Sequence, residues 1–464
     1  MVGKRLRKII VFTVTILLVL VFCASVPSAY PLSIEDEREA GEKFVESIRK
    51  YFEILDDEFS KEYINDLGLY LTSFLETKHF SYRFYIIKDN SLNAFAGPGG
   101  HIFIYSGLIE VMEDLDELVG VICHEIGHIS ARHLAIRIEQ NKKIALATMA
   151  GMLAGVLVGG KAGGTIMSGS MAAGIQKQLR YSREDERQAD QLGFTYVAES
   201  GFDPSGMITT LKKLEKAQWL GTDRIPPYLL THPGGPERIS NIEILSSIHA
   251  PKRERGETSS FRRLFPFFKT VLRAKCMDPY DAERLFRIDL EKNSILAHYG
   301  LGLILKDKSI YAEAIEHFEK ALEEYPDSPS ILRHLAETYQ LKGKDKEAIG
   351  VLERALKIND QDKAALFLLA LSYQNLEEYS KAIRIYERLA LMKPVKDEVF
   401  YNLGVSYGRE ERLALAHYYF GIYFTKSREV AKARFHFQKS ESLAGNDQPM
   451  KSKIHEAMKG LRPN

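Results

Sequence analysis

The chain has 464 residues, more than a single domain usually holds, and 45% of them are hydrophobic, which is enough for extensive buried cores. Its 63 basic and 62 acidic residues nearly cancel, so the overall charge gives no indication of a nucleic-acid-binding protein. Three cysteines are too few for a disulfide framework, and we expect Cys123 to be a small buried apolar residue.

The N-terminal segment, residues 1–29, has the composition of an export signal. Basic residues precede an apolar run over residues 9–26, and Pro27-Ser28-Ala29 follows with small side chains. This order predicts a secretory signal that directs the rest of the chain out of the cytoplasm, in a bacterium to the periplasm. Two alternatives stay open: the run is long enough to serve as an uncleaved membrane anchor, and Cys23 could mark a lipoprotein.

Residues 30–250 have the pattern of an α+β domain. Apolar residues at helical spacing predict two helices within residues 34–78, and residues 82–87 have the composition of a strand. A glycine-rich turn then leads into a second predicted strand, residues 102–105. These strands form either a core hairpin or an edge beside an active-site cleft, where a substrate backbone can pair. The candidates for substrate contact are Asn93, Ala94, Phe95, Gly99 and Gly100.

The segment His124-Glu125-Ile126-Gly127-His128 lies in an apolar stretch that predicts a buried helix. Residues four apart lie on the same face of a helix, so the imidazoles of His124 and His128 can bind one metal ion. In this pattern a Zn²⁺ ion lowers the pKa of a bound water, and the carboxylate of Glu125 takes the proton as the water attacks a carbonyl group. We expect the metal-binding face to continue through Ile136, with His133 on the helix surface.

The stretch over residues 144–175 is rich in alanine, glycine and methionine. Its uncharged part is short for a membrane span, and its glycines weaken a helix. We therefore expect a pair of buried or mobile helices beside the cleft, with a hairpin that dips into a membrane as the alternative.

A catalytic zinc ion usually has three protein ligands, so a carboxylate from a separate helix is expected to complete the site. The charged helix predicted after residue 180 contains Ser182-Arg183, Glu186 and Ala189-Asp190. H-E-x-G-H followed by S-R-x-x-E-x-x-A-D resembles the M48 family of zinc metallopeptidases. The resemblance implies one Zn²⁺ ion per chain, with Glu186 as the third ligand and Glu125 as the general base. It also implies that Asp190 orients a zinc-bound histidine.

Two further segments are similar to the M48 family. Upstream, Asn93-Ala94-Phe95-Ala96 and the glycines before Leu108 match the family's N-A-F-A…G-G…G-L element. Downstream, Thr231-His232-Pro233 and Glu237-Arg238-Ile239 match its T-H-P…E-R-I element. In members joined to helical repeats, the resemblance implies that His232 can approach the metal as a fourth ligand and hold the enzyme latent. The alternative is an ordinary histidine at the start of a helix.

The segment over residues 251–278 is basic and aromatic, with phenylalanines at positions 261, 265, 267 and 268. We expect a solvated linker with a few docking aromatic side chains. Contact with anionic lipid or nucleic acid is the alternative.

Residues 279–445 repeat with a period of 34 residues. Small residues recur at positions 302, 336, 370 and 404 and again at 314, 348, 382 and 416, and large apolar residues recur at 318, 352, 386 and 420. This pattern resembles tetratricopeptide repeats, which stack paired helices and bind partners in a concave groove. Gly421, Ala433 and Phe437 fit the same template shifted by 17 residues, which predicts one inserted helix. The polar tail, residues 446–464, is expected to cap the stack.

Together these features predict a mainly α-helical protein: an α+β zincin-like metallopeptidase domain with a small sheet, followed by an α-solenoid of tetratricopeptide repeats. The combination resembles periplasmic M48 peptidases that carry such repeats. It implies a zinc endopeptidase that acts on unfolded or stalled outer-membrane proteins and contacts the barrel-assembly machinery through its repeats, without a nucleic-acid partner.

Two other functions remain open at this stage. One is a latent or vestigial peptidase that acts mainly as an assembly chaperone. The other is a membrane-anchored M48 protease that processes membrane proteins. The sequence also leaves open the oligomeric state and any peripheral contact with a membrane.

Overall fold

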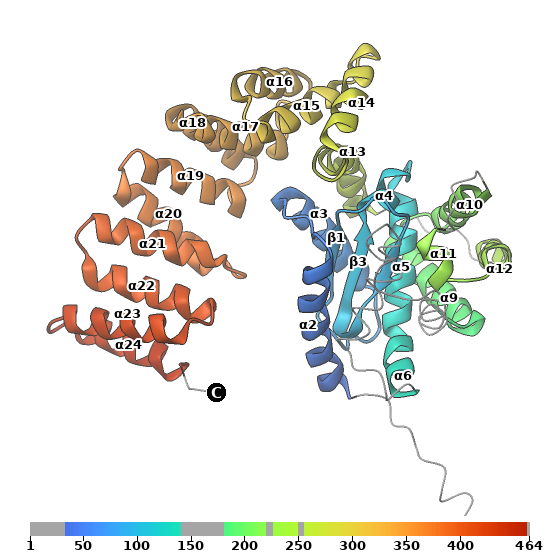
Figure 1. Ribbon diagram of the computed structural model, residues 1–464, viewed down its shortest axis with the longest axis horizontal. Coiled ribbons are helices and arrows are strands. Elements are labelled where there is room, and N and C mark those ends of the chain that lie inside the picture. Colours follow the sequence, from blue (N-terminus) through green and yellow to red (C-terminus); the bar gives the residue numbers. More distant parts are fainter. Residues whose placement is uncertain (1–32, 141–180, 220–225, 249–254, 462–464) are drawn as a thin grey trace, which may run out of the picture. The chain divides into compact units, whose positions relative to one another are not determined.

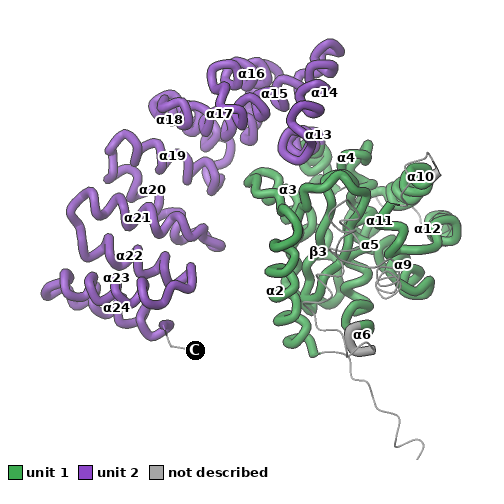
Figure 2. The backbone as a smooth tube through the Cα atoms, viewed as in Figure 1, with its two compact units in different colours: residues 1–265 green, residues 266–464 purple. Residues whose placement is uncertain are grey.

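The computed structural model describes residues 33–140, 181–219, 226–248 and 255–461 of the chain. Contacts divide the chain into two compact units, residues 1–265 and residues 266–464 (Figure 2). The predicted N-terminal signal and the stretch over residues 144–175 lie outside the described residues. Within the described ranges, no helix is both long enough and apolar enough to cross a membrane.

Unit 1 contains a three-stranded sheet (Figure 1). Its strands are β1 (Arg83–Ile87), β2 (Ala94–Ala96) and β3 (His101–Tyr105), in the order β1-β3-β2. β1 runs parallel to β3, and β2 runs antiparallel to it. The predicted second strand is therefore the centre of the sheet. β1 and β2 form the two edges, and β2 contains two of the residues predicted to contact substrate.

Helices surround this sheet in unit 1. They are α2 (Ile34–Tyr51), α3 (Glu58–Thr72), α4 (Ser106–Glu110), α5 (Leu115–Ser130), α6 (His133–Gln140), α9 (Arg183–Ser200), α10 (Ser205–Trp219), α11 (Pro227–Thr231) and α12 (Gly235–Ile248), with a 3-10 turn η1 (Pro98–Gly100) between β2 and β3.

Aromatic side chains link the three strands on one face of the sheet. The strand pairing places Tyr85, Phe103 and Phe95 side by side, and their rings stack with centroids 4.8 Å and 5.0 Å apart. Phe44 of α2 meets Phe95 and Phe103 edge-on, so α2 covers this face. Because side chains alternate along a strand, the two alanines of β2 point to the opposite face, and β2 contacts α5.

The two edges of the sheet differ in how their backbone groups are satisfied. At the β1 edge, the side-chain amide of Asn65 on α3 donates to the carbonyl of Phe84 and accepts from its N–H, at 3.1 Å each. A side chain thus occupies the position of a neighbouring strand. At the β2 edge, the antiparallel pairing directs the N–H and C=O groups of Ala94 and Ala96 away from β3. β2 is therefore the strand whose edge can accept a further chain.

Helix α5 carries the H-E-x-x-H segment through the middle of unit 1. Asp114 caps its first turn by accepting a backbone hydrogen bond. Residues 118–129 are all buried, as the apolar pattern predicts, and Cys123 is among them. A close approach to α9 depends on glycine, because a Cβ atom at Gly127 would lie 2.6 Å from the backbone oxygen of Ala189. The glycine inside the H-E-x-G-H segment thereby brings two helices close enough to share one site.

Helix α13 (Gly256–Cys276) occupies most of the segment for which the sequence predicts a solvated linker. In unit 1, Arg262 binds the carboxylate of Asp116 at the start of α5 with hydrogen bonds of 2.6 Å and 2.7 Å. In unit 2, Arg273 donates to Asp289 at 3.0 Å. The expectation of a solvated linker was wrong for the described part of this segment, because these basic side chains pair with acidic partners from other helices. The expected docking of aromatic side chains is confirmed, since Phe265, Phe267 and Phe268 are buried.

Unit 2 consists of paired helices, which follow the C-terminal part of α13. They are α14 (Pro279–Glu291), α15 (Ile295–Asp307), α16 (Tyr311–Glu324), α17 (Pro329–Leu341), α18 (Asp345–Ile358), α19 (Lys363–Asn375), α20 (Tyr379–Leu391), α21 (Asp397–Arg409), α22 (Leu413–Lys426), α23 (Val430–Leu443) and α24 (Gln448–Lys459). Where α15 and α16 cross, a Cβ atom at Gly302 would lie 2.7 Å from the ring of Phe318. The 34-residue spacing thus reflects the close crossings between paired helices.

The shifted template near the C-terminus does not reflect an inserted helix. Gly404 of α21 faces the ring of Phe420 on α22, and Gly421 of α22 faces the ring of Phe437 on α23. α22 therefore serves as the second helix of one pair and as the first helix of the next. The predicted polar tail contains α24, whose Met450 is buried, so the stack ends in a packed helix.

Candidate metal centre

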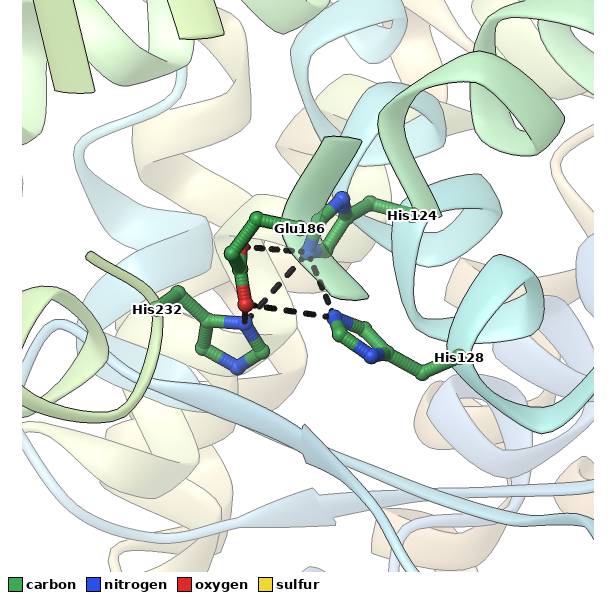
Figure 3. A group of neighbouring side chains, drawn as sticks. All are labelled: His124, His128, Glu186 and His232. Atoms are coloured by element: carbon green, nitrogen blue, oxygen red, sulfur yellow. Dashed lines mark hydrogen bonds and ion pairs between the residues drawn. The ribbon is translucent and has the colours of Figure 1, made fainter. Parts of the chain in front are cut away.

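Four side chains meet inside unit 1 (Figure 3). His124 and His128 come from α5, Glu186 comes from α9, and His232 follows α11. Each offers one ligand atom, and these atoms all lie within 4.8 Å of one another. His124 Nε2 lies 3.0 Å from His128 Nε2 and 3.4 Å from Glu186 Oε2. His232 Nδ1 lies 3.0 Å from Glu186 Oε1.

The contacts behind His124 indicate why this cluster suits a cation. Its Nδ1 lies 2.8 Å from Asp190 Oδ1, so the proton belongs on Nδ1 and Nε2 keeps its lone pair. His128 Nε2 faces it at 3.0 Å, and two lone pairs at this distance repel each other unless a proton or a metal ion lies between them. A carboxylate oxygen of Glu186 lies within 3.5 Å of each imidazole. The donor set therefore fits a divalent metal ion held by two imidazoles and one carboxylate.

The charges around the cluster also favour a cation. Burial and Arg238 lower the pKa of His124, but hydrogen bonds to Asp190 and Glu186 outweigh them and raise it to about 9. Burial acts to raise the pKa of Glu186, but the charges of His232 and Arg238 hold it well below its ordinary value. The carboxylates are therefore ionised, and they favour a positive charge at His124, whether a proton or a metal ion carries it.

Arg238, on α12, connects the two carboxylates of α9. Its guanidinium donates hydrogen bonds of 2.7 Å and 2.8 Å to Asp190 and lies 2.9 Å from Glu186 Oε2. The side chain is buried, so solvent does little to screen this positive charge. Sequence reasoning missed this role. The E-R-I element contains Arg238, but its spacing from the other motifs does not indicate that the arginine reaches both carboxylates.

His133 requires a correction. The helical pattern predicts His133 on the surface and Ile136 on the metal-binding face. The structure buries His133 with its Nδ1 2.9 Å from Nδ1 of His128, whereas Ile136 is 43% exposed. The physical reason is that α5 ends at Ser130 and Arg132 adopts a positive φ of 55°, so α6 starts in a new direction. A single helical pattern continued past the end of α5 therefore predicted the wrong face.

Two tyrosine rings cover the histidines. Tyr181 stacks on His128 with ring centroids 3.9 Å apart, and Tyr228 stacks on His232 with centroids 4.4 Å apart. Both tyrosines are buried, so they exclude water and restrict rotation of the imidazoles. The sequence gives no signal for these contacts, because each depends on segments far apart in the chain.

Glu125 lies next to the cluster with an unsatisfied carboxylate. Both of its oxygens are buried, and neither accepts a hydrogen bond from a described residue. His232 Nε2 lies 3.6 Å from Glu125 Oε1 and also makes no hydrogen bond within the described part of the chain. A buried carboxylate without donors is costly, so these atoms are placed to interact with a group outside the described residues, such as water, a metal ion or a substrate.

The residues predicted to contact substrate divide into two groups. Ala94 and Phe95 lie on β2, which contacts α5. Asn93 directly precedes them, and its buried amide makes no hydrogen bond with the described residues. Gly99 and Gly100 have positive φ values of 72° and 90° and lie in the turn η1. Gly99 faces the backbone of α2, and Gly100 faces the side chain of Phe80 and the backbone of Ser81. The structure thus places β2 beside α5 and the two glycines in a packed turn.

The fold and this cluster define the class of protein. A helix with H-E-x-x-H, a second helix that supplies a carboxylate and a small sheet beside them are the parts of a metallopeptidase domain. A family model described as Peptidase family M48 matches residues 58–246. A tetratricopeptide-repeat model matches residues 281–329, and a model described as anaphase-promoting complex, cyclosome, subunit 3 matches residues 307–389. The chain therefore contains an M48 metallopeptidase domain followed by tetratricopeptide repeats.

Within the peptidase region, the chain is similar to named proteases. It is 32% identical over 214 residues to the beta-barrel assembly-enhancing protease of Escherichia coli (strain K12), a match that covers 45% of this chain and 44% of that protein. It is 32% identical over 165 residues to the metalloprotease LoiP of the same organism, which covers 35% of this chain and 61% of LoiP. The mitochondrial metalloendopeptidase OMA1 of Arabidopsis thaliana is 33% identical over 167 residues, which covers 36% of this chain and 32% of OMA1. The chain thus spans less than half the length of the beta-barrel assembly-enhancing protease that it matches.

Proposed function

We propose that this protein is a zinc-dependent endopeptidase. The observation that carries the proposal is the buried cluster of His124, His128 and Glu186 beside the unsatisfied carboxylate of Glu125. Zinc fits this donor set, because catalytic zinc sites use three protein ligands of these types and keep a further position for water or substrate.

The chain's own residues supply orientation and proton transfer. A bound Zn²⁺ ion supplies a Lewis acid that polarises the scissile carbonyl group and lowers the pKa of water at the site. Glu125 accepts a proton from the attacking water and later delivers it to the leaving amine. Asp190 holds His124 in orientation, and Arg238 holds both Asp190 and Glu186.

The backbone of the substrate pairs with β2. The outward N–H and C=O groups of Ala94 and Ala96 offer hydrogen bonds to an extended chain. Pairing of this kind recognises backbone rather than particular side chains, which suits a peptidase that acts on unfolded proteins. Both alanines are buried, so binding requires the chain around β2 to move aside.

Metal dependence is tested on the full chain with an unfolded protein such as β-casein as substrate. A chelator is expected to abolish hydrolysis, and Zn²⁺ at about one ion per chain is expected to restore it. Hydrolysis that continues at an unchanged rate after the metal has been removed would rule out a zinc peptidase.

The proposal includes a latent resting state, in which His232 would hold a bound metal ion together with His124, His128 and Glu186. His232 Nδ1 lies 3.4 Å from His124 Nε2 and 3.0 Å from Glu186 Oε1, where water or substrate must bind during hydrolysis. The exposure of these three residues, of His128 and of Glu125 is 1% or less. This burial supports latency, because a substrate cannot reach a site that is closed on all sides.

The variant His232→Ala tests latency. If about nine in ten wild-type molecules are latent, the variant is expected to hydrolyse β-casein roughly tenfold faster. His101→Ala, which alters a buried histidine elsewhere in unit 1, is the control and is expected to leave the rate unchanged. A slower rate for His232→Ala with zinc still bound would contradict latency and would indicate that His232 assists the reaction.

The broader role in this proposal is quality control of outer-membrane proteins in a bacterial periplasm. Support comes from the signal-like composition of residues 1–29, from the similarity to a protease named for enhancing β-barrel assembly, and from repeats of a kind that bind proteins. Unfolded or stalled outer-membrane proteins are the proposed substrates, and the barrel-assembly machinery is the proposed partner of unit 2.

The second candidate function is an assembly chaperone with a latent peptidase, and the closed arrangement around His232 favours it. The two functions predict different growth for a bacterial strain that lacks its own beta-barrel assembly-enhancing protease and expresses this chain instead. A chaperone predicts that Glu125→Gln restores growth as well as the wild type does, and a peptidase predicts that it does not. For a membrane-anchored protease, extraction of the expressed protein with carbonate is the deciding measurement.

A further inference from the structure

We propose that His133 is a positioning residue for the metal centre, because it fixes the tautomer of His128 so that Nε2 of His128 is free to bind the metal. The inference rests on the metal centre proposed above. It concerns a residue outside the cluster of four candidate ligands, and it assigns His133 an effect through His128 alone.

The contact between the two imidazoles is the first observation. Nδ1 of His133 lies 2.9 Å from Nδ1 of His128, and both rings are buried. A neutral imidazole carries one N–H and one lone pair, so one Nδ1 atom must donate and the other must accept. The direction of this hydrogen bond decides whether His128 can bind a metal, since Nε2 of His128 keeps a lone pair only if its Nδ1 is the donor.

The surroundings of His133 decide this direction. Its Nε2 lies 3.0 Å from Oε1 of Gln188 and 3.8 Å from Oδ1 of Asp185. A carboxylate only accepts hydrogen bonds, so Asp185 favours a proton on Nε2, and the amide of Gln188 accepts this proton through Oε1. With its proton on Nε2, His133 accepts at Nδ1. The hydrogen bonds therefore run from His128 to His133 and from His133 to Gln188.

The two histidine ligands are thus oriented by different partners. The carboxylate of Asp190 contacts His124 directly, whereas a neutral imidazole contacts His128. Asp190 and Gln188 both lie on α9, the helix that also supplies Glu186. One helix therefore provides a metal ligand and, at alternate positions, the groups that set the orientation of both histidines.

The first experiment measures the Zn²⁺ affinity of the full chain by competition with a chromophoric chelator. His133→Leu removes the acceptor, and we expect roughly 10–100-fold weaker Zn²⁺ binding. His133→Asn keeps an oxygen near the position of Nδ1 and is expected to stay within about threefold of the wild type. His101→Leu removes a buried histidine that contacts the hydroxyl of Tyr85 at 3.1 Å, and it is expected to leave the affinity within about twofold.

A surface substitution tests the direction without disturbing the core. Gln188 is exposed, and Gln188→Lys replaces an acceptor by a donor, which reverses the hydrogen bonds through His133. Gln191→Lys adds the same charge at another exposed position of α9 and is the matched control. We expect Gln188→Lys to bind Zn²⁺ roughly fivefold more weakly than Gln191→Lys.

The visible spectrum of the Co²⁺-loaded protein should change in His133→Leu and stay unchanged in His101→Leu.

The outcomes separate this inference from the function on which it rests. A wild-type chain that does not bind Zn²⁺ overturns the proposed metal centre itself. Equal Zn²⁺ affinities of the wild type and His133→Leu overturn only the role of His133. The same conclusion follows if His133→Asn binds Zn²⁺ as weakly as His133→Leu does while both variants keep the wild-type circular dichroism. If His133→Leu does not fold, equal affinities of Gln188→Lys and Gln191→Lys overturn the proposal.

Discussion

At the scale of single residues, Arg238 holds two carboxylates that would otherwise repel each other in a buried site. Removal of one partner from a buried ion pair leaves the other charge uncompensated, so Arg238→Leu is expected to lower the free energy of unfolding of unit 1 by roughly 3–5 kcal/mol. Urea unfolding in the presence of a chelator measures this loss. Added Zn²⁺ should recover part of it, because the ion binds the folded state and supplies positive charge to Glu186.

Arg183→Leu is the matched control for this substitution. Arg183 pairs with Glu237 at 3.3 Å, but its side chain is 78% exposed, so we expect a change of less than about 1 kcal/mol. Equal losses in Arg183→Leu and Arg238→Leu would contradict the account of the buried network.

The candidate metal ligands were the easiest part of the site to predict. Helical geometry relates His124 to His128 through a spacing of four, and a family motif indicated Glu186; the structure places all three in one cluster. His133 could not be predicted in the same way, because its position follows from the backbone turn at Arg132. A positive φ at an arginine leaves no mark in the sequence, since glycine is the residue that usually adopts it.

At the scale of elements, glycine positions set how closely paired helices of unit 2 approach each other. Gly302→Ala would place a Cβ atom 2.7 Å from the buried ring of Phe318, so it is expected to lower the free energy of unfolding of unit 2 by roughly 1–3 kcal/mol. Gly350, inside α18, has no neighbouring atom within 4 Å of such a Cβ atom. Gly350→Ala is therefore expected to raise the free energy of unfolding by about 0.5–1 kcal/mol.

Hydrogen exchange in the helices of unit 2 measures both effects in the full chain. The account predicts opposite signs for the two glycine substitutions. If both variants were more protected than the wild type, the crossing of α15 and α16 would be looser than the structure describes.

The helices of the repeats followed from periodicity, but the arrangement of the strands did not. The composition of residues 82–87 and 102–105 identified two strands, but a periodic pattern does not determine the order of strands in a sheet. β3 is central because β2 also pairs with it. The half-period shift at Gly421 was visible in the sequence. Its cause was not, because one helix, α22, satisfies two overlapping repeat patterns at once.

At the scale of the whole molecule, the order of peptidase domain and repeats was predictable because each has its own sequence pattern. The M48 match and the tetratricopeptide-repeat match lie in the predicted order along the chain. The segment that connects them was harder to predict. It forms the helix α13, and its basic side chains pair with residues from distant segments, such as Arg262 with Asp116. Substrate, partner and location depend on molecules outside the chain and stay proposals.

The central claim is that Glu125 transfers protons in a zinc peptidase, and Glu125→Gln tests it most directly. Glutamine has nearly the same shape but cannot accept a proton, and the four candidate ligands are unchanged. We expect the variant to keep about one Zn²⁺ ion per chain and to hydrolyse β-casein at least roughly 100-fold more slowly. The measurement is made in the wild-type and in the His232→Ala background, so that latency does not hide the difference. Hydrolysis by zinc-loaded Glu125→Gln at the rate of its parent would contradict the account.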